Sequence, residues 1–425
     1  MEKLFLKSPI FLKNILFNLI SYIENNKRRG KYYKQYLKEF KQFFKIDNSL
    51  KLKKEALKIT KSHPFYKNFV ISNFEDIPII NKATINENYN SFINENSKPY
   101  KVLKTSGTSG QSLTIPCSKA FYQKKFAGYD FFRKLNGLDL SSPNANFFGR
   151  TIFDVNKKQP PYWLFSRLSK QLVFSQYHLN NQTVILYLEQ LEVKKIRWVH
   201  GYPSFLTLFC ELIVEKGLEK RCANLKLSGV TTGSETLFPA QENVIKEVFQ
   251  CEVFNFYGQG EGVADIFQYN KNWNINQAFS FVEFIHYKEN LYHIVGTQLS
   301  NSCMPLLRYD TGDIVELDSK NNVLRIIGRI EDYIYLKDKT KIGRLDHIFK
   351  NVKNIIEAQI RQTIVGEAIF YLNVNSRFDK VNENELKYSI REKLGEDFNY
   401  EIVIVDHIEK TKLGKLKFVV TDIKD

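Results

Sequence analysis

A short run of hydroxyl side chains and glycines is the strongest chemical signal in this sequence. It consists of Thr105, Ser106, Gly107, Thr108, Ser109 and Gly110. Glycines let the backbone approach a ligand closely, and consecutive amides form a nest that binds anions, so such a run suits the β- and γ-phosphates of ATP. It is not a P-loop, because the pattern GxxxxGK[ST] is absent from it. By itself the run fits a phosphate loop and an ordinary flexible turn about equally well.

An aromatic residue and a carboxylate share one later segment. Tyr257 ends a strand-like run and could stack on a purine base. Glu261, four residues on, could hold Mg²⁺, a cation that prefers oxygen ligands and bridges phosphates. The alternative is an edge strand followed by a solvated turn, and the segment taken alone favours that alternative.

Charged residues in three further segments could complete a nucleotide site. Asp313, after a glycine turn, could accept hydrogen bonds from both ribose hydroxyls, while Arg308 would brace the site through ion pairs. Arg329 follows Gly328 at a predicted domain junction and could reach a ribose or a phosphate. Lys415 lies on a glycine turn and suits a mobile charge delivered to a phosphate. Each segment also has a simpler interpretation when it is taken alone. The Asp313 segment fits a charged hairpin turn, the Arg329 segment fits a surface linker, and the Lys415 segment fits a solvated basic tail.

Short apolar runs that alternate with helical patterns must position these residues. Strand-like runs span residues 196–200, 225–230 and 251–257, and each leads into a turn that contains glycine. This alternation, from Lys101 onward, predicts an α/β domain, and ligands bind at the strand ends of open α/β sheets. Residues 1–100 are mostly polar and are predicted to be mostly helical.

A second, smaller unit is predicted after Gly328. Strand-like runs at residues 368–374 and 401–405 flank a helical pattern at 383–394, and a last run at 416–421 follows a glycine-containing turn. A unit of about a hundred residues has the usual size of a domain.

The composition predicts a folded globular protein, because 43% of the residues are hydrophobic. A net charge of +16 would suit nucleic acid or anionic lipid. However, the basic residues are dispersed, and Lys, Asn and Ile are abundant throughout, so no nucleic-acid partner is predicted. The five cysteines form no CxxC pair, which argues against zinc and redox sites and fits a reducing cytoplasm.

The segment from Phe5 to Ile23 is rich in apolar residues. Lys7 and Lys13 interrupt it, and the uncharged stretch at residues 14–23 is too short to span a bilayer. Apolar residues fall at helical spacing at Leu12, Ile15, Leu16, Leu19 and Ile23. The preferred interpretation is an amphipathic helix packed on the body of the protein, and the alternative is an interfacial membrane helix.

The chemical segments occur in the order shown by the adenylate-forming superfamily, which includes acyl-CoA synthetases and peptide-synthetase adenylation domains. Residues 105–110 resemble its phosphate loop. Gly233, Ser234 and Glu235 resemble the segment that lies along the adenine.

The later segments extend this resemblance. Tyr257 and Glu261 resemble the adenine and Mg²⁺ motif, and residues 308–313 resemble the ribose motif, which is the most specific match. Arg329 resembles the start of the hinge, and Lys415 resembles the late catalytic lysine.

The N-terminal region narrows the resemblance to one branch. The residues that look like the N-terminal region of the phenylacetate–CoA ligase branch are Ser8-Pro9, Arg28 and Arg29, residues 63–66, residues 77–78 and Lys82. Within that branch the chain looks most like the CapK-type proteins linked to capsular polysaccharide genes, and the resemblance covers essentially the whole chain.

Two positions depart from the superfamily's pattern. Leu113-Thr114 stand where the phosphate loop often ends in Pro-Lys, and Glu331 stands at the hinge position, which usually holds Asp. The candidates for the acyl pocket are Phe148, Gly149, Tyr202 and Asn255.

The resemblance implies an α/β fold of the adenylate-forming type. It implies a large N-terminal α/β domain at residues 1–328, a hinge at 329–331 and a small mobile α+β domain at 332–425. The implied activity is that of a ligase that uses ATP and Mg²⁺ to convert a carboxylic acid into an acyl-adenylate. The acyl group would then pass to coenzyme A, or to an amine or hydroxyl of a sugar in capsular or surface polysaccharide biosynthesis.

An alternative function is a non-catalytic nucleotide-binding scaffold protein of a glycan-assembly complex. The presence of Lys415, Glu261 and Asp313 together argues against it. The expected location is the cytoplasm, with peripheral association at the inner face of the membrane left open.

Overall fold

The structure is a computed structural model. It describes residues 8–105, 113–148, 152–154, 156–329, 333–339, 341–342, 345–349, 352–411 and 416–423. Two compact units are formed from interleaved parts of the chain. The first unit contains residues 1–22, 141–254 and 330–425, and the second unit contains residues 23–140 and 255–329.

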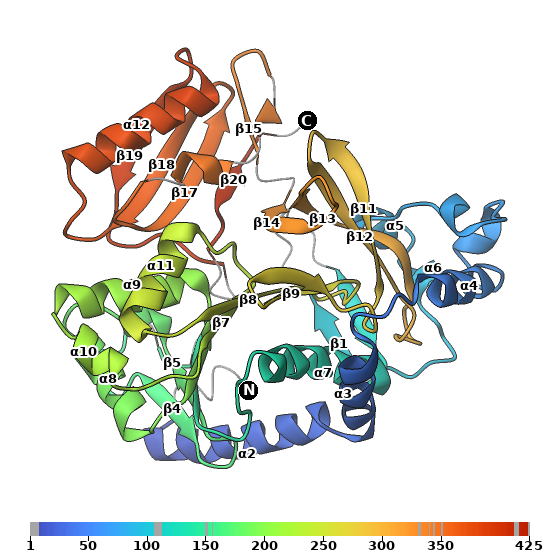
Figure 1. The fold of residues 1–425 in the computed structure, drawn as a ribbon, viewed down its shortest axis with the longest axis horizontal. Coiled ribbons are helices and arrows are strands. Elements are labelled where there is room, and N and C mark those ends of the chain that lie inside the picture. Colours follow the sequence, from blue (N-terminus) through green and yellow to red (C-terminus); the bar gives the residue numbers. More distant parts are fainter. Residues whose placement is uncertain are drawn as a thin grey trace. The chain divides into compact units, whose positions relative to one another are not determined.

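A largely parallel sheet is the centre of the first unit (Figure 1). Its strands lie in the order β7 (Val230–Gly233), β6 (Trp198–Gly201), β3 (Asn144–Phe147), β5 (Gln171–Phe174) and β4 (Trp163–Ser166). Its helices are α8 (Val184–Val193), α9 (Pro203–Glu215), α10 (Glu219–Ala223) and α11 (Pro239–Phe249). Every residue of β3, β6 and β7 is buried, as expected for parallel strands covered on both faces.

The predicted strand at residues 225–230 is misplaced. The amides of Leu225 and Lys226 still bond to carbonyls of α10, and Lys226 has a φ of 49°, so these residues close the helix. The strand β7 begins at Val230 and runs into the segment predicted to be a turn. The other two predicted strands shift only slightly, to β6 and to β8 (Val253–Gly258).

The C-terminal residues of the first unit have a hydrophobic core of their own. A four-stranded sheet has the order β19 (Asn399–Ile404), β18 (Glu367–Val374), β17 (Ile355–Ile364) and β20 (Val419–Thr421). Helix α12 (Lys380–Leu394) joins β18 to β19 and packs on this sheet through Leu386 and Ile390. Shorter elements precede the sheet: β15 (Ile334–Tyr335), β16 (Lys341–Ile342) and η4 (Leu345–Phe349). The predicted elements of this region are thus confirmed in type and order.

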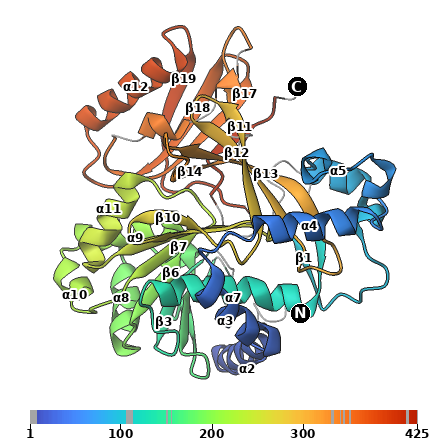
Figure 2. The same cartoon turned by 45° about the vertical axis from the view of Figure 1, so that its right-hand side comes forward.

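The second unit combines helices with antiparallel strands (Figure 2). Its sheet is a meander of β11 (Phe281–Lys288), β12 (Leu291–Gln298), β13 (Leu306–Leu317) and β14 (Val323–Arg329). A hairpin of β1 (Lys101–Lys104) and β2 (Thr114–Cys117) precedes α7 (Lys119–Leu135), and β9 (Asp265–Tyr269) pairs with β10 (Asn272–Ile275). The N-terminal part is mostly helical, as predicted, with α3 (Lys31–Phe43), α4 (Ser49–Thr60), α5 (Lys82–Glu87) and α6 (Tyr89–Phe92).

The predicted N-terminal helix forms as α2 (Ile10–Arg28) and packs on the body of the protein as expected, but not through the predicted apolar positions. Lys13 is buried, whereas Leu16 is half-buried and the other predicted core positions are exposed: Leu12, Ile15, Leu19 and Ile23. The helix contacts the first unit through a different side, where Phe17 packs against a small apolar cluster. Within the described residues, no helix has both the length and the apolar character needed to cross a bilayer.

Candidate functional site

Asp313 of the predicted ribose motif lies in strand β13 of the second unit and is only 8% exposed. The Tyr257 hydroxyl, at the end of β8, donates a hydrogen bond to Asp313 Oδ2 over 2.6 Å. Burial, and next the Asp313 carboxylate, raise the pKa of Tyr257 well above its ordinary value, so Tyr257 stays a protonated donor. The structure therefore joins two predicted nucleotide residues directly.

A bulge in β13 precedes Asp313 and is held by local hydrogen bonds. Gly312 has a φ of 73°, a conformation that favours glycine, and its amide donates to Asp310 Oδ1. The Asp313 amide donates to Thr311 Oγ1, and the Thr311 hydroxyl donates in turn to the carbonyl of Ile294 on β12. These bonds fix the direction of the strand at Asp313.

Glu261, the predicted Mg²⁺ ligand, is 4% exposed in the second unit. The Tyr309 hydroxyl donates to Glu261 Oε1 over 3.1 Å, so the carboxylate is held in place by a neighbour of Asp313 on β13. The described residues contain no group of three or more His, Cys, Asp or Glu side chains that could hold a metal ion by themselves. A single buried carboxylate fits a Mg²⁺ ion that takes its other ligands from phosphate oxygens and water.

Thr105, the first residue of the predicted phosphate loop, lies against the turn that carries Glu261. A Cβ atom on Gly260 would come within 2.9 Å of Thr105 Cγ2, so glycine is required there for this close approach. Thr105 also closes the base of its loop, because its amide bonds to the carbonyl of Leu113 and its hydroxyl accepts from the Leu113 amide. The other predicted phosphate-loop residues, 106–110, lie outside the described residues.

Lys125 on α7 is a site-forming residue that the sequence did not reveal. Its ammonium donates to the carbonyls of Gln259 and Gly260 over 3.0 and 2.6 Å. Burial lowers the pKa of Lys125, against the opposing effects of Cys117 and Glu261. The lysine thus holds the turn between Tyr257 and Glu261 and adds a positive charge near the carboxylate. No local pattern distinguishes it from the other lysines of α7.

Arg308 braces the second unit through ion pairs, as predicted. Its guanidinium contacts both carboxylate oxygens of Glu283 at 3.1 and 3.2 Å. A second edge donates to the carbonyls of Glu75 and Ile77, which ties the helical N-terminal region to strand β13.

Arg329 is the last residue of β14 and is the backbone partner of Asp313 in the β13–β14 ladder. The register therefore puts two predicted nucleotide residues side by side at the end of one strand pair. The predicted hinge residue Glu331 lies outside the described residues.

The predicted adenine segment lies in the first unit, where β7 ends at Gly233 and Ser234 has a φ of 70°. Glu235 accepts the amide of Ser204, at the start of α9, and the amide of Leu416 at 3.2 and 3.1 Å. Burial raises the pKa of Glu235, and the nearby charge of Lys410 opposes that shift. The side chain of Glu235 therefore connects β7 with the C-terminal basic segment.

Lys415 itself lies outside the described residues, but both sides of its segment are placed. Lys410 and Leu416 form an isolated antiparallel bridge, and the Leu416 amide is bound to Glu235. The ammonium of Lys410 pairs with the buried Glu357 carboxylate at 2.5 Å. Lys410 is thus engaged in a structural ion pair.

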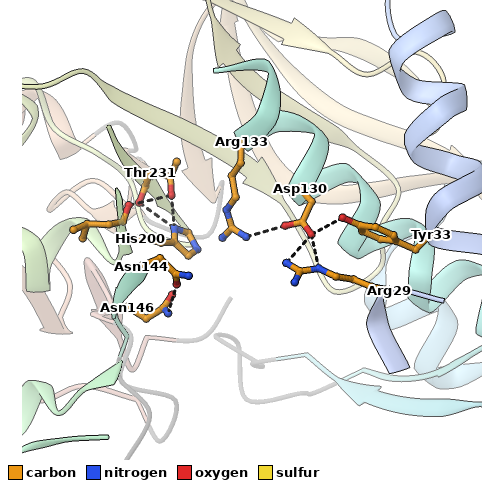
Figure 3. A network of polar contacts seen from close by, with 9 residues as sticks. Arg29, Tyr33, Asp130, Arg133, Asn144, Asn146, His200 and Thr231 are labelled. Atoms are coloured by element: carbon orange, nitrogen blue, oxygen red, sulfur yellow. Dashed lines mark hydrogen bonds and ion pairs between the residues drawn. The ribbon is translucent and has the colours of Figure 1, made fainter. Parts of the chain in front are cut away.

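Two candidates for the acyl pocket contact each other in the first unit. The ring of Phe148 packs edge-on against Tyr202 at 5.1 Å and against His200 at 4.6 Å. His200 is buried, and its Nδ1 lies 3.0 and 2.9 Å from the carbonyl and hydroxyl oxygens of Thr231 (Figure 3). Gly149 lies outside the described residues, whereas Asn255 belongs to the second unit, where its amide donates to Gln268.

Arg29, part of the N-terminal resemblance, has a structural role in the second unit. Its guanidinium pairs with the buried Asp130 carboxylate at 2.9 Å, and the Tyr33 hydroxyl donates to the same oxygen (Figure 3). Arg133 contacts the other Asp130 oxygen at 3.3 Å. This network joins α7 to the segment between α2 and α3.

The chain as a whole is similar to known proteins. Residues 334–422 match the CapK C-terminal domain family. The chain is 25% identical to protein CapK of Staphylococcus aureus over 448 aligned residues, which cover 98% of each chain.

Two of the solved structures with a similar fold are acyl-CoA ligases. A 2-hydroxyisobutyryl-CoA ligase in the postadenylation state, in complex with R3-HIB-AMP, has a TM-score of 0.62 and 15% identity, covering 92% of this chain and 89% of that one. An anthranilate CoA ligase in complex with anthranoyl-AMP has a TM-score of 0.51 and 12% identity, covering 74% of this chain and 65% of that one. The predicted α/β fold of the adenylate-forming type is therefore confirmed. The full-length likeness to CapK and the match of its C-terminal domain confirm the predicted resemblance to the CapK-type proteins.

Proposed function

We propose that this protein is an ATP-dependent ligase that activates a carboxylic acid as an acyl-adenylate and then transfers the acyl group to an acceptor. The proposal rests on one observation: residues from separate motifs contact one another within the second unit. Thr105 contacts the turn of Glu261, Tyr309 binds Glu261, and Tyr257 binds Asp313, although these residues come from three distant segments. The acyl-AMP complexes of the structural neighbours support the same chemistry.

Several of the predicted nucleotide-binding residues have proposed roles. Asp313 accepts the ribose hydroxyls, and its position is set by the Tyr257 hydroxyl, while the ring of Tyr257 meets the adenine. Residues 105–110 bind the phosphates. Mg²⁺, held by Glu261, would neutralise phosphate charge when bound. Lys125 keeps the Glu261 turn in place and is a positioning residue.

The proposed first half-reaction is a displacement at phosphorus. A carboxylate oxygen of the acid attacks the α-phosphorus of ATP, the bond to the bridging oxygen breaks, and pyrophosphate leaves. Positioning and electrostatic stabilisation supply most of the catalysis in such reactions. Lys415 is proposed to stabilise the charge that develops at the α-phosphate.

The proposed second half-reaction is acyl transfer, in which the acceptor attacks the acyl carbon and AMP leaves. Coenzyme A is the acceptor suggested by the names of the structural neighbours. A sugar amine or hydroxyl in capsular or surface polysaccharide biosynthesis is suggested only by the likeness to CapK. Residues 332–425 are proposed to be the mobile domain, with a hinge at 329–331, and a cytoplasmic location is proposed.

A screen for acid-dependent ATP–pyrophosphate exchange over a broad panel of carboxylic acids tests this function. Wild type should exchange with at least one acid, and Asp313→Ala should not. Glu316→Ala is the matched control, because Glu316 lies on the same strand and pairs with Arg325 instead of a proposed site residue. Tight ATP binding without exchange would favour the non-catalytic scaffold, and absence of ATP binding would exclude both functions.

A further inference from the structure

Helix α2 exposes an apolar face. Six large side chains occupy this face, with exposures from 41% for Ile23 to 74% for Phe11: Phe11, Leu12, Ile15, Leu19, Tyr22 and Ile23. At 3.6 residues per turn they fall within an arc of about 120°. The helix is long (Figure 1), so the exposed apolar residues form a continuous stripe over several turns.

The opposite side of α2 attaches the helix to the first unit. Phe17 packs against a cluster of Ile152, Phe153, Leu164 and Val173. The buried ammonium of Lys13 lies over the Phe153 ring at 4.7 Å, and burial lowers the pKa of Lys13. A charged residue therefore faces the protein while the apolar residues face outward, which is the reverse of an ordinary surface helix.

A turn with basic and apolar residues lies beside this helix. The Asn18 side chain accepts the Arg167 amide at 2.8 Å and donates to the Phe165 carbonyl at 3.3 Å, so the β4–β5 turn is fixed to α2. Arg167, Leu168 and Lys170 on this turn are all exposed. Residues 8–23 contain no acidic residue. The apolar stripe is therefore flanked by positive charge.

We propose that the α2 stripe and the β4–β5 turn form a docking surface for an anionic lipid bilayer. Amphipathic helices of this type lie in the membrane interface, with the apolar face among the acyl chains and cationic residues at the headgroups. A second copy of the chain is a poorer occupant, because pairing two stripes would bring Arg167 and Lys170 near like charges. The proposal goes beyond the proposed ligase activity and does not depend on it.

Sedimentation with phospholipid vesicles tests the proposal. The wild-type chain should bind vesicles of phosphatidylcholine and phosphatidylglycerol, and binding should weaken in high salt. Ile15→Ser with Leu19→Ser should reduce the partition coefficient at least about tenfold, because two buried apolar contacts are lost. Arg167→Gln and Lys170→Gln should each reduce it about fivefold.

Matched controls distinguish vesicle binding through this surface from nonspecific adsorption of the protein to vesicles. Val193→Ser with Ile364→Ser removes two apolar side chains that are 66% and 57% exposed on other elements, and it should leave binding within about twofold of wild type, as side chains outside the docking surface bury no area. Phe11→Trp keeps the stripe apolar and adds a fluorescent side chain to it. The emission maximum of this tryptophan should shift to the blue only when anionic vesicles are added.

Three results would overturn the proposal. The first is the absence of wild-type binding to anionic vesicles. The second is unchanged binding by a folded Ile15→Ser, Leu19→Ser variant, with helix content equal to wild type by circular dichroism. The third is a lipid-free dimer by light scattering that this variant dissociates, which would identify a second copy as the occupant.

Discussion

Replacing Tyr257 with phenylalanine would remove one hydroxyl and keep the ring that is proposed to meet the adenine. That hydroxyl donates to Asp313 Oδ2 over 2.6 Å, and the acceptor is only 8% exposed. A hydrogen bond to a charged group contributes about 1.5–3 kcal/mol to stability. We therefore expect Tyr257→Phe to lower the free energy of unfolding by about 1–3 kcal/mol, measured by urea denaturation at neutral pH.

A double-mutant cycle isolates this bond. Asp313→Ala leaves the Tyr257 hydroxyl without its carboxylate acceptor, so it should cost at least as much stability as Tyr257→Phe. The double variant should lose less free energy of unfolding than the two single variants lose together. The difference, the coupling free energy, should be about 1.5–3 kcal/mol. Tyr66→Phe is the control, because the Tyr66 hydroxyl donates to the Leu307 carbonyl at 3.1 Å instead. Combined with Asp313→Ala, it should be additive within about 0.5 kcal/mol.

Nucleotide binding gives a separate measurement on the same variants. Asp313→Ala should weaken ATP binding at least about a hundredfold, because two charge-assisted bonds to ribose hydroxyls would be lost. Tyr257→Phe should weaken it about tenfold, through loss of Asp313 positioning alone. A coupling free energy near zero would refute the Tyr257–Asp313 bond. Unchanged ATP affinity of Asp313→Ala by calorimetry would refute the ribose assignment.

Substitutions of three other residues have specific expected results. Lys125→Met should slow ATP–pyrophosphate exchange about tenfold by freeing the Glu261 turn, with partial rescue by Lys125→Arg, and a wild-type rate would show that the lysine is dispensable. Lys415→Ala should slow adenylation about 10²–10³-fold yet leave acyl transfer from a presynthesised acyl-adenylate near the wild-type rate, and equal slowing of both steps would contradict its role. Burial raises the pKa of Asp265 to about 7, so its contribution to stability should be lost as the pH rises from about 4 to about 7. The unfolding free energy of wild type relative to Asp265→Asn should fall over this range, and a constant difference would refute the shift.

The sequence predicts helix α2 but not the environment of its apolar face. The spacing of Leu12, Ile15, Leu19 and Ile23 correctly predicts a helix with one apolar face. A period of 3.6 residues identifies which side chains share a face, but it carries no information on whether that face meets protein, lipid or water. Only the packing of Phe17 and Lys13 on the first unit decided that the apolar face is exposed.

The sequence by itself determined the elements and motifs that depend on neighbouring residues. The C-terminal strands and helix follow from local apolar periodicity. The positive φ of Gly312 follows from the backbone freedom of glycine, although the residue lies in a bulge of β13 and not in the predicted turn. The strand before Gly233 was misplaced, because the turn that closes α10 extends past Lys226.

The tertiary structure decided which distant side chains meet. Lys125 reaches the carbonyls of Gln259 and Gly260, Tyr257 reaches Asp313, and the Leu416 amide reaches Glu235, across separations that no local pattern encodes. Such contacts depend on strand register and helix packing, which are set by the burial of many residues together rather than by a short segment. The motifs therefore indicated the chemistry, whereas folding set the partners that hold its side chains in place.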